Sequence, residues 1–455
     1  MAVSQTYNQK LTRGIFMKKK VLFIQPTIYD DKGKLVKKNK LYFVGLAYPL
    51  LAAMLPNDWE SEICLETIEN IPFDTDASVI GIGGMGHAAN RSKDIALEFK
   101  RRGKIVIMGG PMASLAPDLA KKYFDSVVIG DAENVWHKVI KDIEDDKLQP
   151  FYKEDITKLS TPLPRYDLIL NKKIGDFLPV QAGRGCPNSC KFCSIYCIYR
   201  NKYFKRDIEE VIRDIKYIKE LGFKKFLLID DNIVADPEYM KNLCKEIKKL
   251  NMKWMSQCAI DIVKNEELLK IVADSGCFTL SFGLESISKE SLLKINKDWC
   301  NPDEYLGIIN KVVDAGIEVA SEMIVGVDTD TKESLRKTVD FVLNAGIIAP
   351  KFYIMTPIPG TDLYKEMLQT NRLVEEDVLK FTPSKAVITH PNMTASELTD
   401  MYWEIYDKVY TYKHIFKRTL FNKNFFKDPN RYIFFLMVNL YYRYQIKKKI
   451  APNIM

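Results

Sequence analysis

The fold is decided by residues 186–193, which read Cys186-Pro187-Asn188-Ser189-Cys190-Lys191-Phe192-Cys193, a C-x₃-C-x₂-C spacing. Three thiols this close together can hold one compact soft-metal centre, either a structural zinc ion or an iron–sulfur cluster. Zinc takes four protein ligands, and Cys197 is the only local candidate for the fourth. A four-iron cluster held by three cysteines leaves one iron open to a ligand that is not protein. Three unrelated buried cysteines are a further alternative, although such residues seldom cluster on a glycine-bearing loop.

The motif C-x₃-C-x-aromatic-C at the end of a first strand resembles that of radical S-adenosylmethionine (SAM) enzymes. The resemblance implies that Cys186, Cys190 and Cys193 hold a [4Fe–4S] cluster whose open iron is chelated by the amino and carboxylate groups of SAM. One electron from the cluster then cleaves the sulfonium and yields a 5′-deoxyadenosyl radical. An electron donor such as flavodoxin or ferredoxin is implied as well.

Length and composition indicate a large protein of ordinary soluble type. The 455 residues are enough for two domains and a smaller appendage, and 47% of them are hydrophobic and 28% charged. No apolar run reaches the ~20 residues of a membrane-spanning helix, and residues 1–16 lack the apolar core of a signal peptide. Nine cysteines, an odd number, do not suggest a disulfide framework. We therefore expect a cytoplasmic protein with a loose extension over residues 1–17.

Residues 18–140 alternate apolar runs with helix-like segments. Five short apolar runs have the character of buried parallel strands: 21–24, 59–65, 78–82, 104–108 and 126–129. Three of them end in glycine-bearing loops, at Gly84, Gly109-Gly110 and Gly130. This pattern predicts an α/β fold with an open, doubly wound parallel sheet, which binds ligands beyond the carboxyl ends of its strands. Glycines at such places can also serve only to make tight turns.

This first part of the chain is similar to the cobalamin-binding domain that precedes many radical SAM cores. The match lies in the segments 45–48, 109–111 and 130–133. It implies bound cobalamin, with these residues as contacts: Gly45, Gly84, Gly109, Gly110, Gly130 and Glu133. The D-x-H-x-x-G motif, which supplies a histidine to cobalt, is absent, because Met85 and Asn90 stand around His87 where Asp and Gly would be. Either cobalamin binds without a histidine on cobalt or the domain has lost it, and we interpret His87 as a loop residue.

The rest of the chain up to residue 373 predicts a second, regular domain. Residues 141–176 are less periodic and contain three prolines, so we interpret them as a linker. Over residues 177–373 a helix, a glycine and a strand recur in that order, and the glycines that stop the helices are Gly222, Gly276, Gly316 and Gly346. About six strand–helix units predict a partial (β/α)₆ TIM-like barrel with its active site at the carboxyl ends of the strands. Residues 374–455 are expected to form a helical C-terminal region.

Polar residues gather at the predicted strand ends of this barrel, as a bound SAM requires. The family resemblance assigns Glu285 to SAM and Phe192 to the adenine side, with Asp230, Asp231 and Gln257 as further contacts. A single acidic residue at such a place can instead cap a helix or lie in a solvated turn. Residues 326–330 and 359–364 resemble those of the cobalamin-domain branch that includes hopanoid methylases and the anaerobic chlorophyll-ring cyclase.

The tail from Met401 is basic and aromatic. It carries eight lysines and three arginines against three acidic residues, and thus accounts for the whole net charge of +8. It also holds 15 aromatic residues among 55. Such a segment can lie on an anionic membrane surface, or it can pack over the barrel with a solvated basic face. Nucleic-acid binding is not expected, because the remaining chain is close to neutral.

The combined pattern predicts a radical SAM enzyme, and the family implies methylation of an unactivated carbon with cobalamin as the methyl donor. A hydrophobic small molecule or a lipid is the expected substrate, since the basic, aromatic tail adds some weight to such substrates. One alternative keeps the fold but replaces methyl transfer by cyclisation, rearrangement or carbon–carbon coupling. Another is a non-catalytic zinc-binding scaffold.

Overall fold

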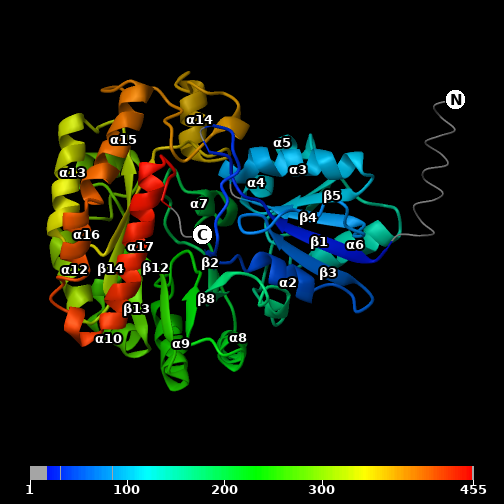
Figure 1. Cartoon of the computed structure of the whole chain (residues 1–455), viewed down its shortest axis with the longest axis horizontal. Helices are drawn as coiled ribbons and strands as arrows, with labels where there is room; N and C mark the ends of the chain where they lie inside the picture. Colours follow the sequence, from blue (N-terminus) through cyan, green and yellow to red (C-terminus); the bar gives the residue numbers. More distant parts are fainter. Residues whose placement is uncertain (1–17, 31, 85, 453–455) are drawn as a thin grey trace. The chain divides into compact units, whose positions relative to one another are not determined.

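The computed structural model describes residues 18–452 apart from Asp31 and Met85 (Figure 1). The extension predicted for residues 1–17 lies outside these residues. The chain divides into two compact units, the first ending at Gly175 and the second beginning at Asp176.

The first unit is built on a six-stranded, wholly parallel sheet in the order β3-β1-β4-β5-β6-β7. Its strands are β1 (Lys20–Gln25), β3 (Glu60–Leu65), β4 (Val79–Gly83), β5 (Ile105–Gly109), β6 (Ser126–Ile129) and β7 (Phe151–Lys153). The prediction of a doubly wound parallel sheet is confirmed, and β7 adds a sixth strand from within the segment interpreted as a linker. Strand β1 lies between β3 and β4, so the strand order reverses beside β1. In sheets of this kind such a reversal opens a crevice at the carboxyl ends of the strands.

Helices cover both faces of this sheet. They are α2 (Ala47–Ala53), α3 (Ala89–Arg101), α4 (Pro111–Leu115), α5 (Pro117–Lys121) and α6 (Trp136–Glu144). Helices α2 and α6 share one face, because the rings of Tyr48 and Trp136 lie 5.9 and 6.0 Å from the ring of Phe23 on β1. In Figure 1, α3 and α5 lie on the side of the sheet away from α2. The alternation of strand and helix in sequence thus gives a layered α/β unit.

The second unit contains six parallel strands in the order β15-β14-β13-β12-β11-β8, as predicted for a partial barrel. They are β8 (Ile174–Val180), β11 (Lys225–Leu228), β12 (Lys253–Cys258), β13 (Cys277–Glu285), β14 (Glu318–Val325) and β15 (Ala349–Ile354). Within the first unit, the Leu41 N–H of the short strand β2 (Leu41–Phe43) donates to the Lys173 carbonyl at 3.0 Å. A two-stranded antiparallel ribbon, β9 (Gly183–Gly185) and β10 (Tyr203–Lys205), comes after β8.

A helix follows each strand of the barrel. These helices are α8 (Ile208–Glu220), α9 (Pro237–Leu250), α10 (Glu266–Asp274), α12 (Tyr305–Asp314), α13 (Lys332–Asn344) and α14 (Asp362–Gln369), with the short α7 (Ser194–Tyr199) and α11 (Lys289–Lys294) between them. Apolar residues on α8 recur at helical spacing, and Val211, Ile215 and Ile218 are fully buried. The same pattern in the other helices closes the outer layer of the barrel.

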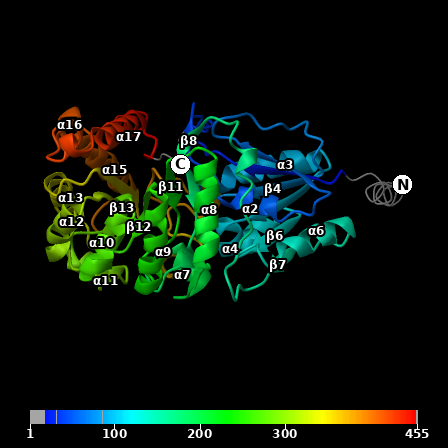
Figure 2. The ribbon, with the colours of Figure 1, turned by 90° about the horizontal axis from the view of Figure 1, so that it is seen from below.

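The basic tail packs on the second unit as helices α15 (Ala395–Val409), α16 (Tyr412–Arg418) and α17 (Pro429–Lys447), which Figure 2 shows grouped together, apart from α9 to α12. Buried residues of α17 are spaced alternately three and four apart, at Tyr432, Phe435, Asn439, Tyr442 and Ile446. The Tyr432 hydroxyl donates to Glu318 on β14, and the Asn439 amide donates to the Ile348 carbonyl at 3.0 Å. The aromatic residues on this side of α17 therefore belong to the core of the second unit.

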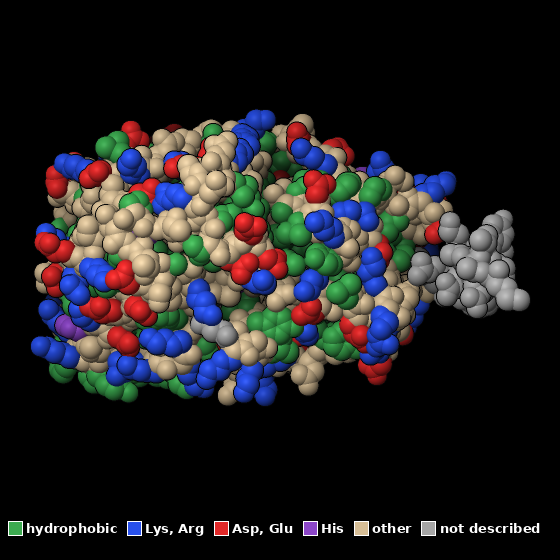
Figure 3. Space-filling model, turned by 90° about the horizontal axis from the view of Figure 1, so that it is seen from above, with side chains coloured by type: hydrophobic (Ala, Val, Ile, Leu, Met, Phe, Trp, Pro, Cys, Tyr) green, Lys and Arg blue, Asp and Glu red, His purple; other side chains and the backbone are tan. Residues whose placement is uncertain are grey.

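On its outer side the tail exposes charge and several rings. On the face drawn in Figure 3, Lys and Arg side chains are interspersed with Asp and Glu. Within the described residues, no helix is both long and apolar enough to cross a membrane.

Candidate functional site

Backbone atoms of the cysteine loop, residues 186–193, form hydrogen bonds to other segments that hold the loop in place. The Lys191 N–H donates to the Ile295 carbonyl at 3.0 Å, and the Lys191 carbonyl accepts from the Leu363 N–H at 3.1 Å. The Asn296 amide donates to the Ser189 carbonyl at 2.7 Å. These contacts come from the segment after α11 and from the first turn of α14, so the loop is fixed from two sides by distant parts of the second unit.

Gly185 lets the ribbon β9–β10 close against this loop. Its φ is +90°, and a Cβ atom there would lie 2.2 Å from the Lys202 carbonyl oxygen. Only glycine adopts this conformation and approach without strain. The preceding glycine, Gly183, is equally crowded, because a Cβ atom there would lie 2.2 Å from the Tyr203 hydroxyl. Two glycines therefore set the path of the chain into the first cysteine.

Asp230 and Asp231, predicted as SAM contacts, hold the backbone of the same loop in the structure. Asp230 is 2% exposed and accepts from the Ala182 N–H at 2.8 Å. Asp231 accepts from the Gly185 N–H at 2.8 Å. Burial raises the pKa of Asp230 to about 7, although the Ala182 N–H acts in the opposite direction. Sequence analysis placed both carboxylates at the correct strand end, but it had no sign that they bond to main-chain atoms.

The three thiols of the motif lie close enough to influence one another. Burial raises the pKa of Cys190 to about 12, and Cys193 and Cys186 add to this shift while the Lys297 ammonium opposes it. Burial also raises the pKa of Cys186 and of Cys193. Without a metal these groups are neutral thiols, whereas coordination to a metal deprotonates them.

Cys197 does not join this group. Its thiol lies 3.4 Å from the Gly360 carbonyl oxygen, and the charges that act on it come from Arg200, Asp362 and Lys365. Within the described residues, no three His, Cys, Asp or Glu side chains are arranged around one metal ion. Cys186, Cys190 and Cys193 remain the predicted cluster ligands, and Asn232 places an amide group 3.9 Å from the Cys186 sulfur.

A buried ion pair lies at the end of β13, beside the thiols. The Lys297 ammonium donates to Glu285 at 2.9 Å and to the Gly283 carbonyl at 2.7 Å, and both side chains are less than a tenth exposed. Burial opposes the charge on Lys297, but the carboxylate of Glu285 outweighs it and raises the pKa of Lys297. The Lys297 ammonium also lies 5.2 Å from the ring centroid of Trp299, whose buried N–H has no partner among the described residues. Sequence analysis singled out Glu285 but not Lys297, because a lysine in a loop carries no pattern of its own.

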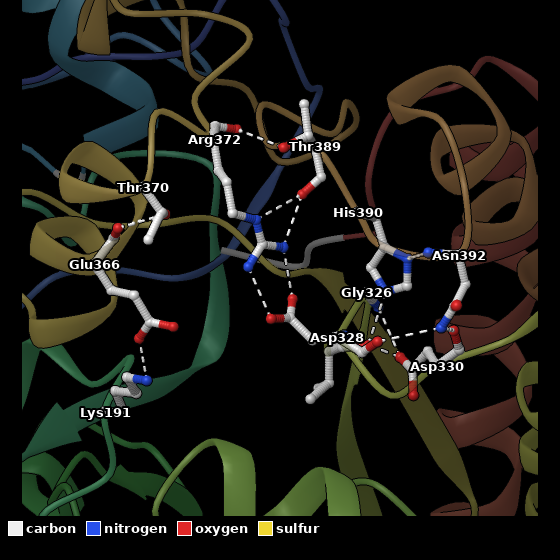
Figure 4. A network of polar contacts seen from close by, with 11 residues as sticks. Lys191, Gly326, Asp328, Asp330, Glu366, Thr370, Arg372, Thr389, His390 and Asn392 are labelled. Carbon is white, nitrogen blue, oxygen red and sulfur yellow. Dashed lines mark hydrogen bonds and ion pairs between the residues drawn. The ribbon is translucent and has the colours of Figure 1, made fainter.

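A polar network at the end of β14 ties the following segment to the barrel (Figure 4). Arg372 makes a two-pronged ion pair with Asp328, at 2.6 and 2.7 Å, and also donates to the Thr389 carbonyl. The ring of His390 contacts the Val327 carbonyl at 2.8 Å. Figure 4 also shows the ion pair between Lys191 of the cysteine loop and Glu366 of α14. Asp328 therefore has a structural role, because its carboxylate binds Arg372 of the following segment.

Phe192 and Gln257 remain predicted SAM contacts. Phe192 is half-buried in the turn that comes after Lys191. Gln257 is an exposed residue of β12, and its amide lies 3.5 Å from Glu322 on β14.

In the first unit, the strand ends near the reversal of strand order are lined by glycines. A Cβ atom on Gly110 would lie 3.6 Å from the Gly84 nitrogen, so the loops after β4 and β5 are neighbours. At Gly109 and Gly130 a Cβ atom would meet none of the described atoms within 4 Å, beyond the adjoining residues. The edge is therefore open above these two glycines.

Three side chains near this edge, those of Gln25, His87 and Glu133, bear on the kind of ligand it can hold. The buried Oε1 of Gln25, the last residue of β1, has no hydrogen-bond partner among the described residues, and it lies 3.6 Å from where a Cβ of Gly45 would be. His87 is exposed on a short turn after β4. Glu133 lies half-buried in the loop after β6. Open space and an unpaired acceptor fit a bulky ligand with hydrogen-bond donors, as a corrin amide would supply.

Comparison with known proteins agrees with this geometry. Residues 180–342 match the family model described as the radical SAM superfamily. The bacteriochlorophyllide d C-12(1)-methyltransferase of Chlorobaculum tepidum is 28% identical over 362 residues, covering 77% of this chain and 79% of the relative. The C-8(2)-methyltransferase of the same organism is 27% identical over 434 residues, 91% of this chain and 94% of the relative.

Two relatives correspond to the branch named from the sequence, which is confirmed. A hopanoid C-2 methylase from Rhodopseudomonas palustris is 25% identical over 345 residues, 72% of this chain and 65% of the relative. The anaerobic magnesium-protoporphyrin IX monomethyl ester cyclase of Cereibacter sphaeroides is 27% identical over 239 residues, 51% of this chain and 38% of the relative.

Solved structures share the fold. The cobalamin-dependent SAM radical enzyme OxsB superposes with a TM-score of 0.67 at 13% identity, covering 94% of this chain and 73% of the other. The radical SAM methyltransferase TsrM from Kitasatospora setae gives a TM-score of 0.62 at 15% identity, covering 84% and 83%. Residues 180–342 therefore form a radical SAM domain, in a chain that is similar to these methyltransferases over most of its length.

Proposed function

We propose that this chain is a cobalamin-dependent radical SAM methyltransferase that adds a methyl group to a carbon of an organic substrate. The observation that carries the proposal is the cysteine loop, in which three mutually close thiols lie beside the buried Glu285–Lys297 pair. The names of two relatives that match most of the chain, both methyltransferases of bacteriochlorophyllide d, support the reaction class.

Each cofactor has a matching set of residues. Cys186, Cys190 and Cys193 would hold the [4Fe–4S] cluster, which when bound supplies the electron that cleaves SAM. The Lys297 ammonium provides a buried positive charge that offsets the negative charge of the thiolates. The glycines at the open edge of the first unit, with the unpaired acceptor of Gln25, would receive cobalamin.

The protein's own groups would bind and orient SAM. Lys297 contacts one oxygen of Glu285, so the second oxygen is available to a donor group of SAM. Phe192 and Gln257 would complete the SAM contacts. Asp230 and Asp231 would act as positioning residues, since they fix the backbone that carries Cys186.

The test is anaerobic purification and reconstitution with iron and sulfide, followed by two assays. The first measures 5′-deoxyadenosine from SAM under reducing conditions together with the corrin content of the protein. The second supplies methyl-labelled SAM with bacteriochlorophyllide d and traces the label into product by mass spectrometry. Deoxyadenosine with bound corrin and labelled product is expected. Deoxyadenosine without corrin would favour the cyclase-type alternative, and zinc without iron would favour the scaffold.

We also propose that the loop between α16 and α17 contacts an anionic membrane surface. Phe421 is 77% and Phe426 90% exposed, and the lysines Lys423 and Lys427 beside them are exposed as well. Exposed rings flanked by cations suit the headgroup region of anionic lipid. Full-length protein should cosediment with phosphatidylglycerol vesicles, and the double variant F421S/F426S should bind at least several-fold less. The exposed Leu97 on α3 provides the matched control L97S. Equal binding of all three proteins would contradict the membrane contact.

A further inference from the structure

A second polar group lies on the barrel strands, one row of residues away from the Glu285–Lys297 pair. In the register of the sheet Gly283 stands opposite Glu322, and Glu322 stands opposite Lys351. Residues that pair across parallel strands point to the same face of a sheet. This row on β13, β14 and β15 therefore presents Glu322 and Lys351 on one face, whereas a register shift after Gly283 pairs Glu285 with Met323.

Gly283 brings the two groups together. A Cβ atom there would lie 2.5 Å from the Glu285 carboxylate and 3.1 Å from the Lys297 ammonium. The Glu285 carboxylate and the Lys297 ammonium therefore occupy the space that a side chain at position 283 would need. Glu322 stands opposite this position on the neighbouring strand. Tyr353, two residues after Lys351, is 40% exposed, and its pKa is raised to about 12 by burial and is influenced by Lys351, Glu322 and Glu285.

Lys351 lacks the short contacts that a largely buried ammonium normally makes. Its side chain is 18% exposed, and its one acceptor among the described residues is Glu322 at 3.7 Å. Lys297, by comparison, has acceptors at 2.7 and 2.9 Å. Charged hydrogen bonds of nitrogen to oxygen are usually about 2.7–2.9 Å long. The Lys351 ammonium therefore has donor capacity left over.

Glu322, in contrast, has several donor groups close to a single carboxylate oxygen. Three donors surround one of its oxygens, since Ser281 lies at 3.4 Å, Gln257 at 3.5 Å and Lys351 at 3.7 Å. The group as a whole is thus rich in donors and short of acceptors. A half-buried network of this kind can be completed by a ligand that brings an acceptor, and an anionic acceptor gives the strongest bond to an ammonium.

We propose that Lys351 binds an anionic group of the substrate, a carboxylate or a phosphate, and so fixes the substrate next to SAM. This inference rests on the proposed function, because it names the substrate class of that reaction. It changes the expectation of a purely hydrophobic substrate into one of an amphiphilic molecule with an anionic end. Lys351 would be a substrate-positioning and specificity residue, with Glu322 and Gln257 holding its surroundings.

The test measures binding of simple probes to full-length reconstituted protein with SAM, so that it does not depend on methyl transfer. Benzoate, phenyl phosphate and the neutral benzamide are titrated by calorimetry. One anion should bind measurably and benzamide at least ~10-fold more weakly, and K351M should weaken the anion at least ~10-fold because a charged hydrogen bond is lost. Comparison of the affinities for benzoate and phenyl phosphate shows whether the site prefers a carboxylate or a phosphate.

Controls separate this proposal from misfolding and from failure of the proposed function. K351R should retain anion binding, and K332M, which alters an exposed lysine of α13, should bind as the unmodified protein does. Equal anion affinity in K351M and the unmodified protein, equal affinity for benzamide, or no binding of either anion would overturn the proposal. Deoxyadenosine formation is measured on the same samples, so a protein that cleaves SAM but binds no anion refutes Lys351 alone.

Discussion

The two units carry contrasting carboxyl edges on similar parallel sheets. In the first unit the edge is made of glycines and main-chain groups, and Gly109 and Gly130 leave open space above them. In the second unit the corresponding strand ends carry thiols, carboxylates and ammonium groups, many of them buried. An edge without side chains can receive a bulky, neutral surface, whereas an edge lined by charged groups selects small ionic ones. The comparison teaches that one sheet type supports either task, depending on the residues that come directly after each strand.

The largest effect should come from the thiols. Replacing Cys190 by Ala removes one of three ligands, so deoxyadenosine formation should fall at least ~100-fold and iron content should drop sharply. Cys197→Ala is the matched control, because that thiol faces the Gly360 carbonyl, and it should retain both. The measurements are iron and sulfide analysis and product chromatography. Loss of iron in C197A as well would mean that the fourth cysteine is a ligand.

Next in size is the buried ion pair. Lys297→Met leaves the Glu285 carboxylate buried without its partner, so the free energy of unfolding of the second unit should fall by about 3–5 kcal/mol. The double variant E285Q/K297M removes the uncompensated charge and should recover a large part of that loss. Urea unfolding monitored by circular dichroism measures both. A K297M protein as stable as the unmodified one would show that this pair is not desolvated.

The contrast between the edges can also be tested with glycines alone. Gly185→Ala forces a side chain into a left-handed conformation and against the Lys202 carbonyl, and should cost about 2–4 kcal/mol of stability. Gly109→Ala meets open space, so the fold should keep its stability while corrin binding weakens. Thermal unfolding and corrin absorbance distinguish the two outcomes. If G109A were as destabilised as G185A, the edge of the first unit would not be open.

The smallest effect concerns pH. Burial raises the pKa of Asp330, after β14, from an ordinary 3.8 to about 6, although the Gly326 and Val327 N–H groups oppose the shift. Because the folded protein holds this proton more tightly than the unfolded chain, stability should fall as pH rises from about 4 to 6, by up to about 3 kcal/mol. In D330N that part of the pH dependence should disappear. Urea unfolding of both proteins between about pH 4 and 6 measures this change. If stability depended on pH in D330N as it does in the unmodified protein, the prediction would be wrong.

Sequence reasoning located the strands, because they are short apolar runs bounded by glycines, and such patterns are local. It also found the cysteine loop, whose spacing is itself the signal. It could not find Lys297 or Lys351, because their surroundings arise from the pairing of β13, β14 and β15 and from the space left by Gly283. Asp328 lies in the acidic segment after β14, and its structural role is visible only from its contact with Arg372, 44 residues later.

The position of α17 bears on how the chain is made. Its buried Tyr432, Asn439 and Tyr442 complete the core of the second unit, yet they come after every strand of that unit in the chain. The first unit ends at Gly175 and can fold on the ribosome while translation continues. The barrel, in contrast, has to wait until α17 has left the exit tunnel, so a chain truncated between β15 and α17 would carry a finished first unit attached to an unfinished second one.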